Sequence, residues 1–339
     1  MEREARGGCP LSSVGSKVDY EAPRISPVTE GIQRPLWSVM IPTFNCAQYL
    51  RHTLESVLQQ DPGPEQMQIE VIDDCSTKDD PEAVVREVGR GRVAFHRKPK
   101  NAGAIANFNT CIERSHGELI HILHGDDGVL SGFYSAIERL ATQHPDCALY
   151  ATRCFFADEQ GRYTQITGRL PELEDVPSND VTGFYALNPL QFAGVAVRRS
   201  FYEREGGFLP RLVHAADWEM WARAVARGKG IVTADVLAVY RMFEGNDTGR
   251  LMRTAENLAD EERLYAVLHG RHPEVDLAEI DRRVFRKALV QEERFSRLGD
   301  EAAVAAHRAF RRARKNWANL GFRLKLFVVR AGKRLLIWP

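Results

Sequence analysis

Two adjacent aspartates, Asp126 and Asp127, follow a short apolar segment at 118–123. The segment has the length and composition of a buried strand, which predicts that both carboxylates lie at the strand's carboxyl end. Neighbouring carboxylates repel each other, and a hard divalent cation such as Mn²⁺ or Mg²⁺ holds such a pair together. A cation bound there could in turn hold a diphosphate. The dipeptide alone is equally compatible with a turn and the N-cap of a helix at 131–141.

Polar residues also follow three other predicted strands. The strands are 37–41, 68–72, 92–96 and 118–123, and the polar groups after the first three contain Thr43 and Asn45, then 73–76, then Asn101. Helical periodicity separates the strands, with Asn45 and Asn101 as expected N-caps. Parallel neighbours need such crossovers, so the fold class is α/β, with a Rossmann-like, mostly parallel sheet and helices on both faces. Ligands of such sheets bind beyond the carboxyl ends of the strands, where the polar groups should converge.

The remaining segments are less regular. Residues 1–35 show no periodicity and should form a flexible N-terminal arm or one laid on the surface. The α/β domain is expected over 36–250, and helical periodicity from 256 predicts a C-terminal helical extension over 251–339. Further strands are predicted at 149–156, 192–197 and 231–240, and a helix at 217–227.

The composition limits the function classes. The chain has 339 residues, 44% of them hydrophobic, with 46 basic and 46 acidic side chains, so no overall field favours nucleic acid. Six cysteines include no pair at the spacing of zinc or redox motifs, which indicates reduced thiols. No apolar segment has the form of a secretory signal or a membrane span. We therefore expect a cytoplasmic protein.

Two common phosphate-binding motifs are absent. No GxGxxG follows the first predicted strand, and no GxxxxGK[ST] occurs in the sequence. These absences argue against dinucleotide and P-loop nucleotide binding. A phosphate group would have to be bound another way, and the aspartate pair offers one.

Six segments resemble family 2 glycosyltransferases in order and spacing. They are "WSVMIPTFN" (37–45), "IEVIDDCS" (69–76), "KNAGAIANFN" (100–109), "HILHGDDGVL" (121–130), "FAGVAVRRSFYEREGGF" (192–208) and "HAADWEMWARA" (214–224). Each segment is weakly specific by itself, whereas six in order over residues 36–245 are strongly specific. The resemblance implies a GT-A fold, with nucleotide-sugar binding at 36–130 and an acceptor half at 131–250.

The resemblance also implies where the nucleotide sugar binds. Its contacts are expected at Pro42, Thr43, Asn45, Asp73, Asp74, Asn101, Gly103 and Asp126. Among these, Asp74 matches the acid that hydrogen-bonds uracil in members that use UDP-sugars. Without the resemblance, 73–76 would be an Asx turn or a helix start, and Asn101 an ordinary N-cap.

Asp126 and Asp127 fall on the family's DxD-like motif, whose acids bind the Mn²⁺ or Mg²⁺ that bridges the donor's phosphates. His124 stands at the first acid of that motif. A single histidine is more often a bystander than a ligand, so we assign the metal to the two aspartates. A second departure follows the last predicted strand. Phe243 stands where members often have a histidine, so either Arg241 or another group supplies the positive charge, or the metal site is weaker than usual.

Asp217 matches the family's catalytic base. Transfer with inversion needs a carboxylate opposite the leaving diphosphate, where it accepts the proton of the acceptor hydroxyl. An aspartate at a helix start is also a favoured cap, and Trp218 and Trp221 beside it could be core residues. The resemblance favours the catalytic interpretation.

The C-terminal segment suggests a partner. After Glu301 the sequence contains no acid, and basic residues alternate with aromatic and aliphatic ones. Such a helix suits an anionic bilayer, which would place the protein peripherally on the inner membrane face and make a lipid-linked acceptor attractive. Packing against its own domain or in a homodimer explains the pattern equally well.

The sequence therefore predicts an inverting, metal-dependent glycosyltransferase of the hexosyl or N-acetylhexosaminyl type. It would move the sugar from a nucleoside diphosphate, expected to be UDP, to a hydroxyl acceptor. The main alternative is a catalytically inactive nucleotide-binding or scaffold protein on the same fold. A nucleotidyltransferase would carry a Gly-rich basic loop that 37–50 lacks. The sugar, the acceptor and the oligomeric state stay open.

Overall fold

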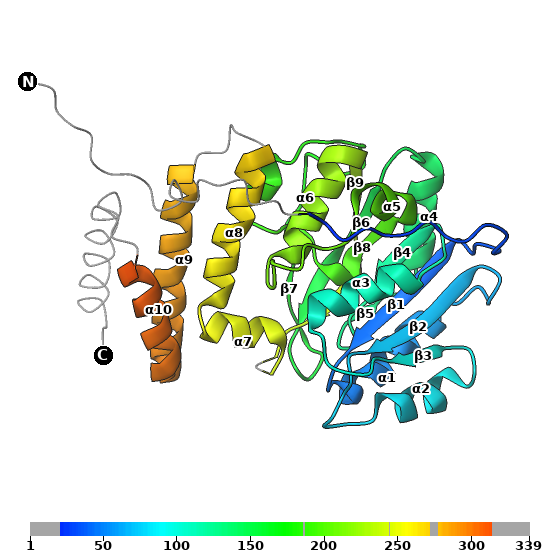
Figure 1. Cartoon of the computed structure of the whole chain (residues 1–339), viewed down its shortest axis with the longest axis horizontal. Helices are drawn as coiled ribbons and strands as arrows, with labels where there is room; N and C mark the ends of the chain where they lie inside the picture. The colour runs from blue at the N-terminus through cyan, green and yellow to red at the C-terminus, as the bar shows by residue number, and fades with distance from the viewer. Residues whose placement is uncertain (1–20, 186, 244, 272–276, 314–339) are drawn as a thin grey trace, which may run out of the picture. The chain divides into compact units, whose positions relative to one another are not determined.

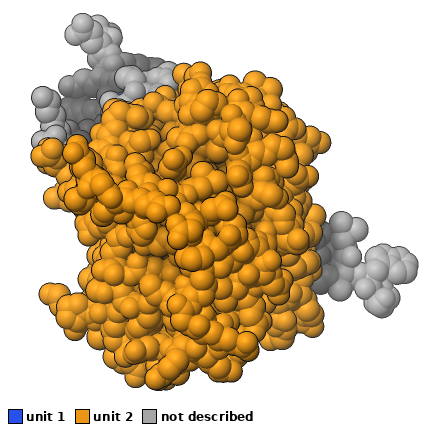
Figure 2. All heavy atoms as spheres, turned by 90° about the vertical axis from the view of Figure 1, so that its right-hand side faces the viewer, with its two compact units in different colours: residues 1–19, 244–339 blue, residues 20–243 orange. Residues whose placement is uncertain are grey.

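The computed structural model of the chain describes residues 21–185, 187–243, 245–271 and 277–313. Within these residues the chain forms two compact units, the first ending at Phe243 and the second comprising the helices that follow. The boundary expected from the sequence lay a few residues later, at 250. Figure 2 shows one face of this first unit, residues 20–243, which is drawn in orange and named unit 2 in the key.

Strands and helices alternate through the first half of this unit, as the sequence predicted (Figure 1). The elements are β1 (Trp37–Thr43), α1 (Ala47–Leu58), β2 (Met67–Asp73), α2 (Pro81–Gly89), β3 (Ala94–Arg97), α3 (Ala104–Arg114) and β4 (Leu119–Ile122). The four strands pair in parallel in the order β3-β2-β1-β4. Their carboxyl ends therefore lie at one edge of the sheet.

Helices cover both faces of these strands. Side chains alternate along a strand, and Val39 and Ile41 of β1 pack in one core cluster with Leu54 of α1 and Ile137 of α4 (Phe133–Gln143). Met40 between them is buried on the opposite face. Helix α3 contacts β1, β2 and β4. Because the chain steps from β1 to β3 and then returns past β1 to β4, right-handed crossovers place α3 on the face opposite α1.

The second half makes the complete sheet a mixed one, with antiparallel pairs that the strand-helix pattern did not predict. Its strands are β5 (Gly128–Val129), β6 (Leu149–Ala157), β7 (Tyr163–Ile166), β8 (Val195–Arg198) and β9 (Gly230–Arg241). Strand β8 is antiparallel to both β4 and β6, β7 is antiparallel to β6, and β5 is antiparallel to β9, whereas β6 and β9 are parallel. A hairpin such as β6-β7 needs no crossover helix, so it leaves no helical signal between its strands.

Besides a 3-10 helix at Thr182–Tyr185, two helices and a short turn complete the first unit. They are α5 (Arg199–Glu205), α6 (Ala216–Gly228) and a 3-10 turn at Phe192–Gly194. The turn shortens the strand predicted at 192–197, which begins only at Val195. Gly194 is needed there because an added Cβ would lie 2.7 Å from the Cys154 Sγ and from the Thr152 carbonyl oxygen. The turn thus packs directly against β6.

The described part of the N-terminal arm, residues 21–35, lies on the first unit. The Arg199 guanidinium donates to the Ser26 carbonyl, and the Arg34 guanidinium donates to the carbonyls of His116 and Gly117. Ile25 is buried, with 3% of its surface exposed. Of the two alternatives for this arm, these residues follow the surface-laid one.

The second unit contains the predicted helices, here α7 (Asp247–Arg253), α8 (Glu256–Arg271), α9 (Leu277–Leu298) and α10 (Glu301–Ala313). Asn246 caps α7 through a side-chain bond from the Gly249 backbone N–H. Two residues of the predicted basic amphipathic segment, Arg308 and Arg311 of α10, pair with Glu292 of α9. The segment beyond 313 lies outside the described residues, so its membrane interpretation stays a prediction. Among the helices described, none has both the length and the apolar character that a membrane span requires.

Candidate metal and nucleotide-sugar site

The loop that carries the two aspartates is fixed by the end of β9. Strand β5 follows the loop directly and pairs with β9, opposite Ala238 and Val239. The Arg241 backbone N–H donates to the Asp127 Oδ1 (2.9 Å), and the Arg241 Nε donates to the Asp126 carbonyl oxygen (3.0 Å). From α1, the Thr53 hydroxyl donates to the Asp127 carbonyl oxygen (2.6 Å). The loop is therefore held on two sides by the protein.

The polar groups after β1, β2 and β4 meet, as the sequence predicted. The Gly125 N–H donates to the Pro42 carbonyl oxygen (3.1 Å), and the Asp74 N–H donates to the Thr43 carbonyl oxygen (2.9 Å). A Cβ on Gly125 would lie 3.1 Å from the Thr43 Oγ1 and the Cys46 Sγ, so the aspartate loop packs closely on the loop after β1. These contacts place Pro42 and Thr43 next to the strand tip that bears the aspartates.

Asn45 and Asn101 lie in this region but do not cap the helices that follow, which corrects the expectation from their residue type. The N-cap of α1 is Cys46 and that of α3 is Gly103, neither with a side-chain cap bond. Asn45 has a left-handed φ of 51°, and its Oδ1 accepts the backbone N–H groups of Thr77 and Lys78. The Asn101 Oδ1 accepts the Gly103 N–H (3.2 Å). Both asparagines therefore shape the loops.

Asp73 and Asp74 differ in what their carboxylates contact. Asp73 is fully buried and accepts bonds from the Ser76 hydroxyl (2.5 Å) and the Arg97 Nε (2.6 Å), which fix the loop after β2; its contact with the nucleotide sugar stays a prediction. The Asp74 carboxylate accepts the backbone N–H groups of Ala102 and Gly103 and pairs with the Lys98 ammonium group (2.8 Å). Asp74 thus connects the end of β2 to the start of α3.

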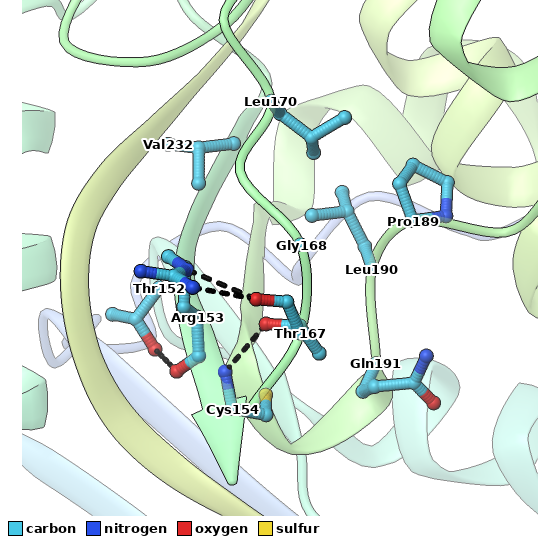
Figure 3. A pocket seen from close by; sticks show the side chains of 10 residues that line it. All are labelled: Thr152, Arg153, Cys154, Thr167, Gly168, Leu170, Pro189, Leu190, Gln191 and Val232. Carbon is cyan, nitrogen blue, oxygen red and sulfur yellow. Dashed lines mark hydrogen bonds between the residues drawn. The ribbon is translucent and has the colours of Figure 1, made fainter. Parts of the chain in front are cut away.

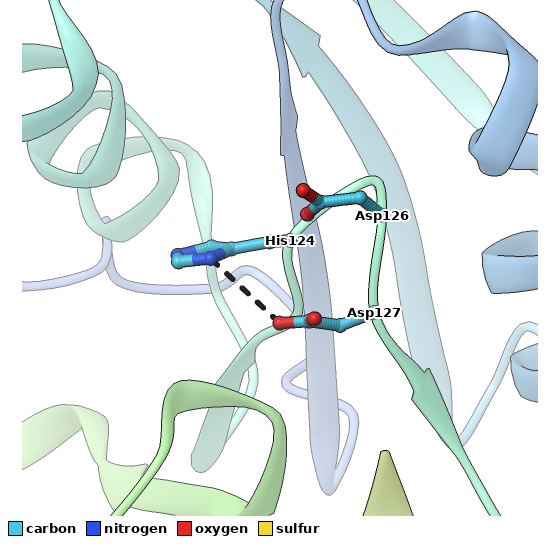
Figure 4. Close-up of side chains that lie close together, drawn as sticks. All are labelled: His124, Asp126 and Asp127. Atoms are coloured by element: carbon cyan, nitrogen blue, oxygen red, sulfur yellow. Dashed lines mark ion pairs between the residues drawn. The ribbon is translucent and has the colours of Figure 1, made fainter. Parts of the chain in front are cut away.

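Three side chains at the tip form a group that could hold a cation. Donor atoms of His124, Asp126 and Asp127 lie within 4.8 Å of one another. All three side chains project the same way from the loop, and the His124 Nδ1 is 3.8 Å from the Asp127 Oδ2 (Figure 4). The Asp127 Oδ2 and the His124 Nε2 are buried and lack hydrogen-bond partners among the described residues. A buried carboxylate oxygen without a partner is costly, and a divalent cation would satisfy it, so the residues fit a metal.

The protonation tendencies at the tip follow from burial. Burial raises the pKa of Asp126 to about 6. Burial, together with the neighbouring Asp126, raises the pKa of Asp127 well above its usual range. Burial lowers the pKa of His124 to about 4, so its ring is neutral at pH 7. A cation bound between the two carboxylates would stabilise their ionised forms, and the neutral imidazole would not repel it.

His124 is the functional candidate that the sequence interpretation set aside. Its ring stacks on Phe108 of α3 (centroids 5.0 Å apart, planes at 12°) and contacts Phe192 (4.5 Å). These aromatic residues hold the imidazole beside the aspartates rather than in the core or in solvent. Its place in the family's acidic motif was the only available signal.

Asp217 lies in the first turn of α6 and is not its N-cap, which is Ala215. The Asn188 Nδ2 donates to the Asp217 Oδ2 (2.8 Å), and the Trp218 N–H donates to the Oδ1 (2.7 Å). One turn later, the ring of Trp221 contacts Phe192 (5.1 Å), which contacts His124. The start of α6 is thus linked to the metal group through two aromatic contacts.

A small pocket lies between β6, the loop after β7 and the segment before Phe192 (Figure 3). Its volume is about 10 Å³. Its lining residues are Thr152, Arg153, Cys154, Thr167, Gly168, Leu170, Pro189, Leu190, Gln191 and Val232. The segment 189–191 directly connects Asn188, the partner of Asp217, to Phe192, the partner of His124.

The structure shows the surroundings of Phe243, which stands in place of a family histidine, and of Arg241, the candidate for the missing positive charge. The Arg241 side chain donates to the carbonyls of Asp126 and Glu159 and lies over the Tyr49 ring, with 7% of its surface exposed. Arg241 therefore stabilises the aspartate loop, and its guanidinium is occupied by backbone carbonyl oxygens. Phe243 packs on the same Tyr49 (4.8 Å).

Comparisons with known proteins identify the family and the fold. The model of glycosyl transferase family 2 matches residues 38–203. The succinoglycan biosynthesis protein ExoU of Rhizobium meliloti is 29% identical over 249 residues, which are 68% of this chain and 69% of ExoU.

Two solved structures share the fold. Mannosyltransferase PcManGT from Pyrobaculum calidifontis, in complex with GDP-Man and Mn²⁺, has a TM-score of 0.53 at 18% identity, over 94% of this chain and 83% of that one. S. aureus TarS 1-349, in complex with UDP-GlcNAc, has a TM-score of 0.51 at 16% identity, over 82% and 92%. The chain belongs to glycosyl transferase family 2 and has the GT-A fold.

Proposed function

We propose that the protein is an inverting, metal-dependent glycosyltransferase that moves a sugar from a nucleoside diphosphate to a hydroxyl acceptor. The observation that carries this proposal is the buried, unpartnered Asp127 Oδ2 beside Asp126 and His124, at the edge where the ends of β1, β2 and β4 meet. The solved relatives were observed with UDP-GlcNAc and with GDP-Man and Mn²⁺, which supports a nucleotide-sugar donor of the hexosyl or N-acetylhexosaminyl type.

The donor would bind across the strand ends. Pro42 and Thr43 end β1, and Asn45 lies in the loop after it, where the nucleoside would lie. Asp74 holds the start of α3, and Asn101 and Gly103 form the segment beside it. We favour UDP as the nucleotide because Asp74 stands where family members that use UDP-sugars have the acid that hydrogen-bonds uracil. The Mn²⁺ or Mg²⁺ at Asp126 and Asp127 would neutralise charge on the leaving diphosphate.

Asp217 would act as the general base. Its Oδ2 is held by the Asn188 amide and its Oδ1 by the Trp218 N–H, so the carboxylate has a fixed orientation. In that orientation it would take the proton of the acceptor hydroxyl as the oxygen attacks the anomeric carbon. Attack opposite the departing diphosphate gives inversion. No residue of the described chain needs to form a covalent intermediate.

The test uses the purified full chain with Mn²⁺ and a panel of UDP- and GDP-sugars. Nucleoside diphosphate release should increase when host extract supplies an acceptor, and mass spectrometry of the product should then identify it. Asp217→Asn should abolish this increase but still bind the donor, whereas Asp158→Asn, in the β6-β7 hairpin, should behave like the wild type. Donor binding without release by the wild type would instead establish the inactive binding protein.

A further inference from the structure

Metal sites of this fold are expected to be acidic, and His124 changes the chemistry of this one. It places a neutral nitrogen donor where an acid would supply a charged oxygen. We propose that His124 is a ligand of the donor-site cation and that it makes the site prefer transition metals such as Mn²⁺ and Co²⁺ over Mg²⁺. This inference rests on the proposed function, since it concerns the cation held by Asp126 and Asp127.

The distances allow His124 to share a cation with the aspartates. Ligands bound at about 2.1 Å from one ion can be at most about 4.2 Å apart. The 3.8 Å between the His124 Nδ1 and the Asp127 Oδ2 already meets this limit. The widest separation in the group, 4.8 Å at most, needs to close by about half an ångström, which is within the reach of side-chain torsions.

The ring is held in place for this role. Phe108 stacks on one side of the imidazole, and Phe192 contacts it at 4.5 Å. Phe192 is itself packed against Trp221 of α6. Because the aromatic neighbours restrict rotation of the ring, its ordering costs little when a cation binds.

No hydrogen bond within the described residues holds the imidazole. The Nδ1 is the ring nitrogen that faces the Asp127 Oδ2, and both that oxygen and the His124 Nε2 are buried without hydrogen-bond partners among the described residues. A histidine with a purely structural role would normally donate to a carbonyl or carboxylate when buried, as His121 does, whose Nε2 lies 3.1 Å from the Ala193 carbonyl oxygen. The two histidines therefore differ in the way expected of a ligand and a core residue.

The donor set decides the metal preference. Mg²⁺ is bound through oxygen, mainly carboxylates and water, whereas imidazole suits transition metals. Replacing one carboxylate by a neutral imidazole removes one negative charge and one hard oxygen. The lost charge weakens the binding of all three cations, whereas the exchange of an oxygen for a nitrogen donor weakens the binding of Mg²⁺ more than that of Mn²⁺ or Co²⁺.

The direct test is pulsed electron paramagnetic resonance of Mn²⁺ bound to the full chain, without donor. A ¹⁴N coupling from a directly bound imidazole is expected in the wild type and in the control His96→Gln, which changes a histidine of β3. The coupling should be lost in His124→Asp. Calorimetric titrations should show that His124→Asp lowers the ratio of the Mg²⁺ to the Mn²⁺ dissociation constant by about tenfold or more.

The outcomes separate this inference from the proposed function. Mn²⁺ binding that Asp127→Asn abolishes, but without a ¹⁴N coupling in the wild type, would overturn the role of His124 and leave the proposed function standing. No Mn²⁺ binding by the wild type, with or without UDP, would remove the cation itself from the proposal. The wild-type spectrum is decisive even if His124→Asp fails to fold.

Discussion

Asp126→Asn should stabilise the metal-free protein and abolish its stabilisation by Mn²⁺. Burial raises the pKa of Asp126 from 3.8 to about 6. A folded-state pKa above the unfolded value means that ionisation at Asp126 opposes folding, an effect absent below pH 4 and complete above pH 6. Two pKa units correspond to about 3 kcal/mol. Because Asp126 is only partly buried, we expect the Asn variant to raise the free energy of unfolding of the metal-free protein by about 1–3 kcal/mol at pH 7.5.

Thermal unfolding at pH 7.5 and pH 4, with EDTA or with Mn²⁺, measures this effect. Without metal at pH 7.5, the variant should melt about 3–10 °C higher than the wild type. At pH 4 the difference should nearly vanish. Mn²⁺ at a hundredfold excess over its dissociation constant should stabilise the wild type by about 2.7 kcal/mol and the variant not at all. Adding Mn²⁺ should therefore reduce or reverse the difference in melting temperature between the variant and the wild type.

The matched control is Asp158→Asn, in the β6-β7 hairpin. The Arg162 backbone N–H and side chain donate to Asp158 and lower its pKa. Its carboxylate therefore favours folding above pH 4, and the variant should melt lower than the wild type at pH 7.5, with an unchanged response to Mn²⁺. If Asp126→Asn also melts lower than the wild type without metal, protein groups already stabilise the Asp126 carboxylate, and the electrostatic reason for a cation is lost.

Three further changes test other parts of the structure. Asn188→Ala should lower kcat by about 10- to 100-fold with little change in donor KM, because Asp217 loses its orienting amide, and an unchanged kcat would contradict that role. Arg241→Ala should reduce the free energy of unfolding in urea by about 3–5 kcal/mol, because buried carbonyls lose a charged donor. The exposed Arg162→Ala should cost less than about 1 kcal/mol, and equal losses would refute the support assigned to Arg241. Gly194→Ala should cost about 1–3 kcal/mol in the same titration, and a gain would contradict the close packing of its turn.

The first half of the fold was predictable because its strands and helices follow from the local pattern of apolar and polar residues. Apolar runs marked β1, β2 and β4, and the polar residues after them converged because parallel strands end at one edge. The antiparallel strands of the second half follow hairpins and long-range pairings that leave no local pattern. Residue type also misled at Asn45, whose left-handed φ and bonds to 77–78 depend on a loop 30 residues away.

The sequence offered signals for the acids of the candidate site and not for its neutral members. Asp126, Asp127 and Asp217 were assigned from an acidic motif and a helix start, and their roles stay predictions. His124 was set aside because a single histidine is more often a bystander, and the residues that hold its ring, Phe108 and Phe192, lie elsewhere in the sequence. Asn188 carried no signal at all, since a single asparagine in a loop gains meaning only through the Asp217 carboxylate that it contacts.

Part of the support of the aspartate loop comes from beyond the family match, which ends at residue 203. Strand β9 supplies the backbone donor of Asp127 and the only strand partner of β5 within the described residues. A shortened protein that stops at the match would keep Asp126 and Asp127 but lose the strand that orients their loop. The shortest protein that keeps the loop in place should therefore extend through Arg241. Exchanging β9 between relatives should change the affinity for the cation although the residues that bind it stay the same.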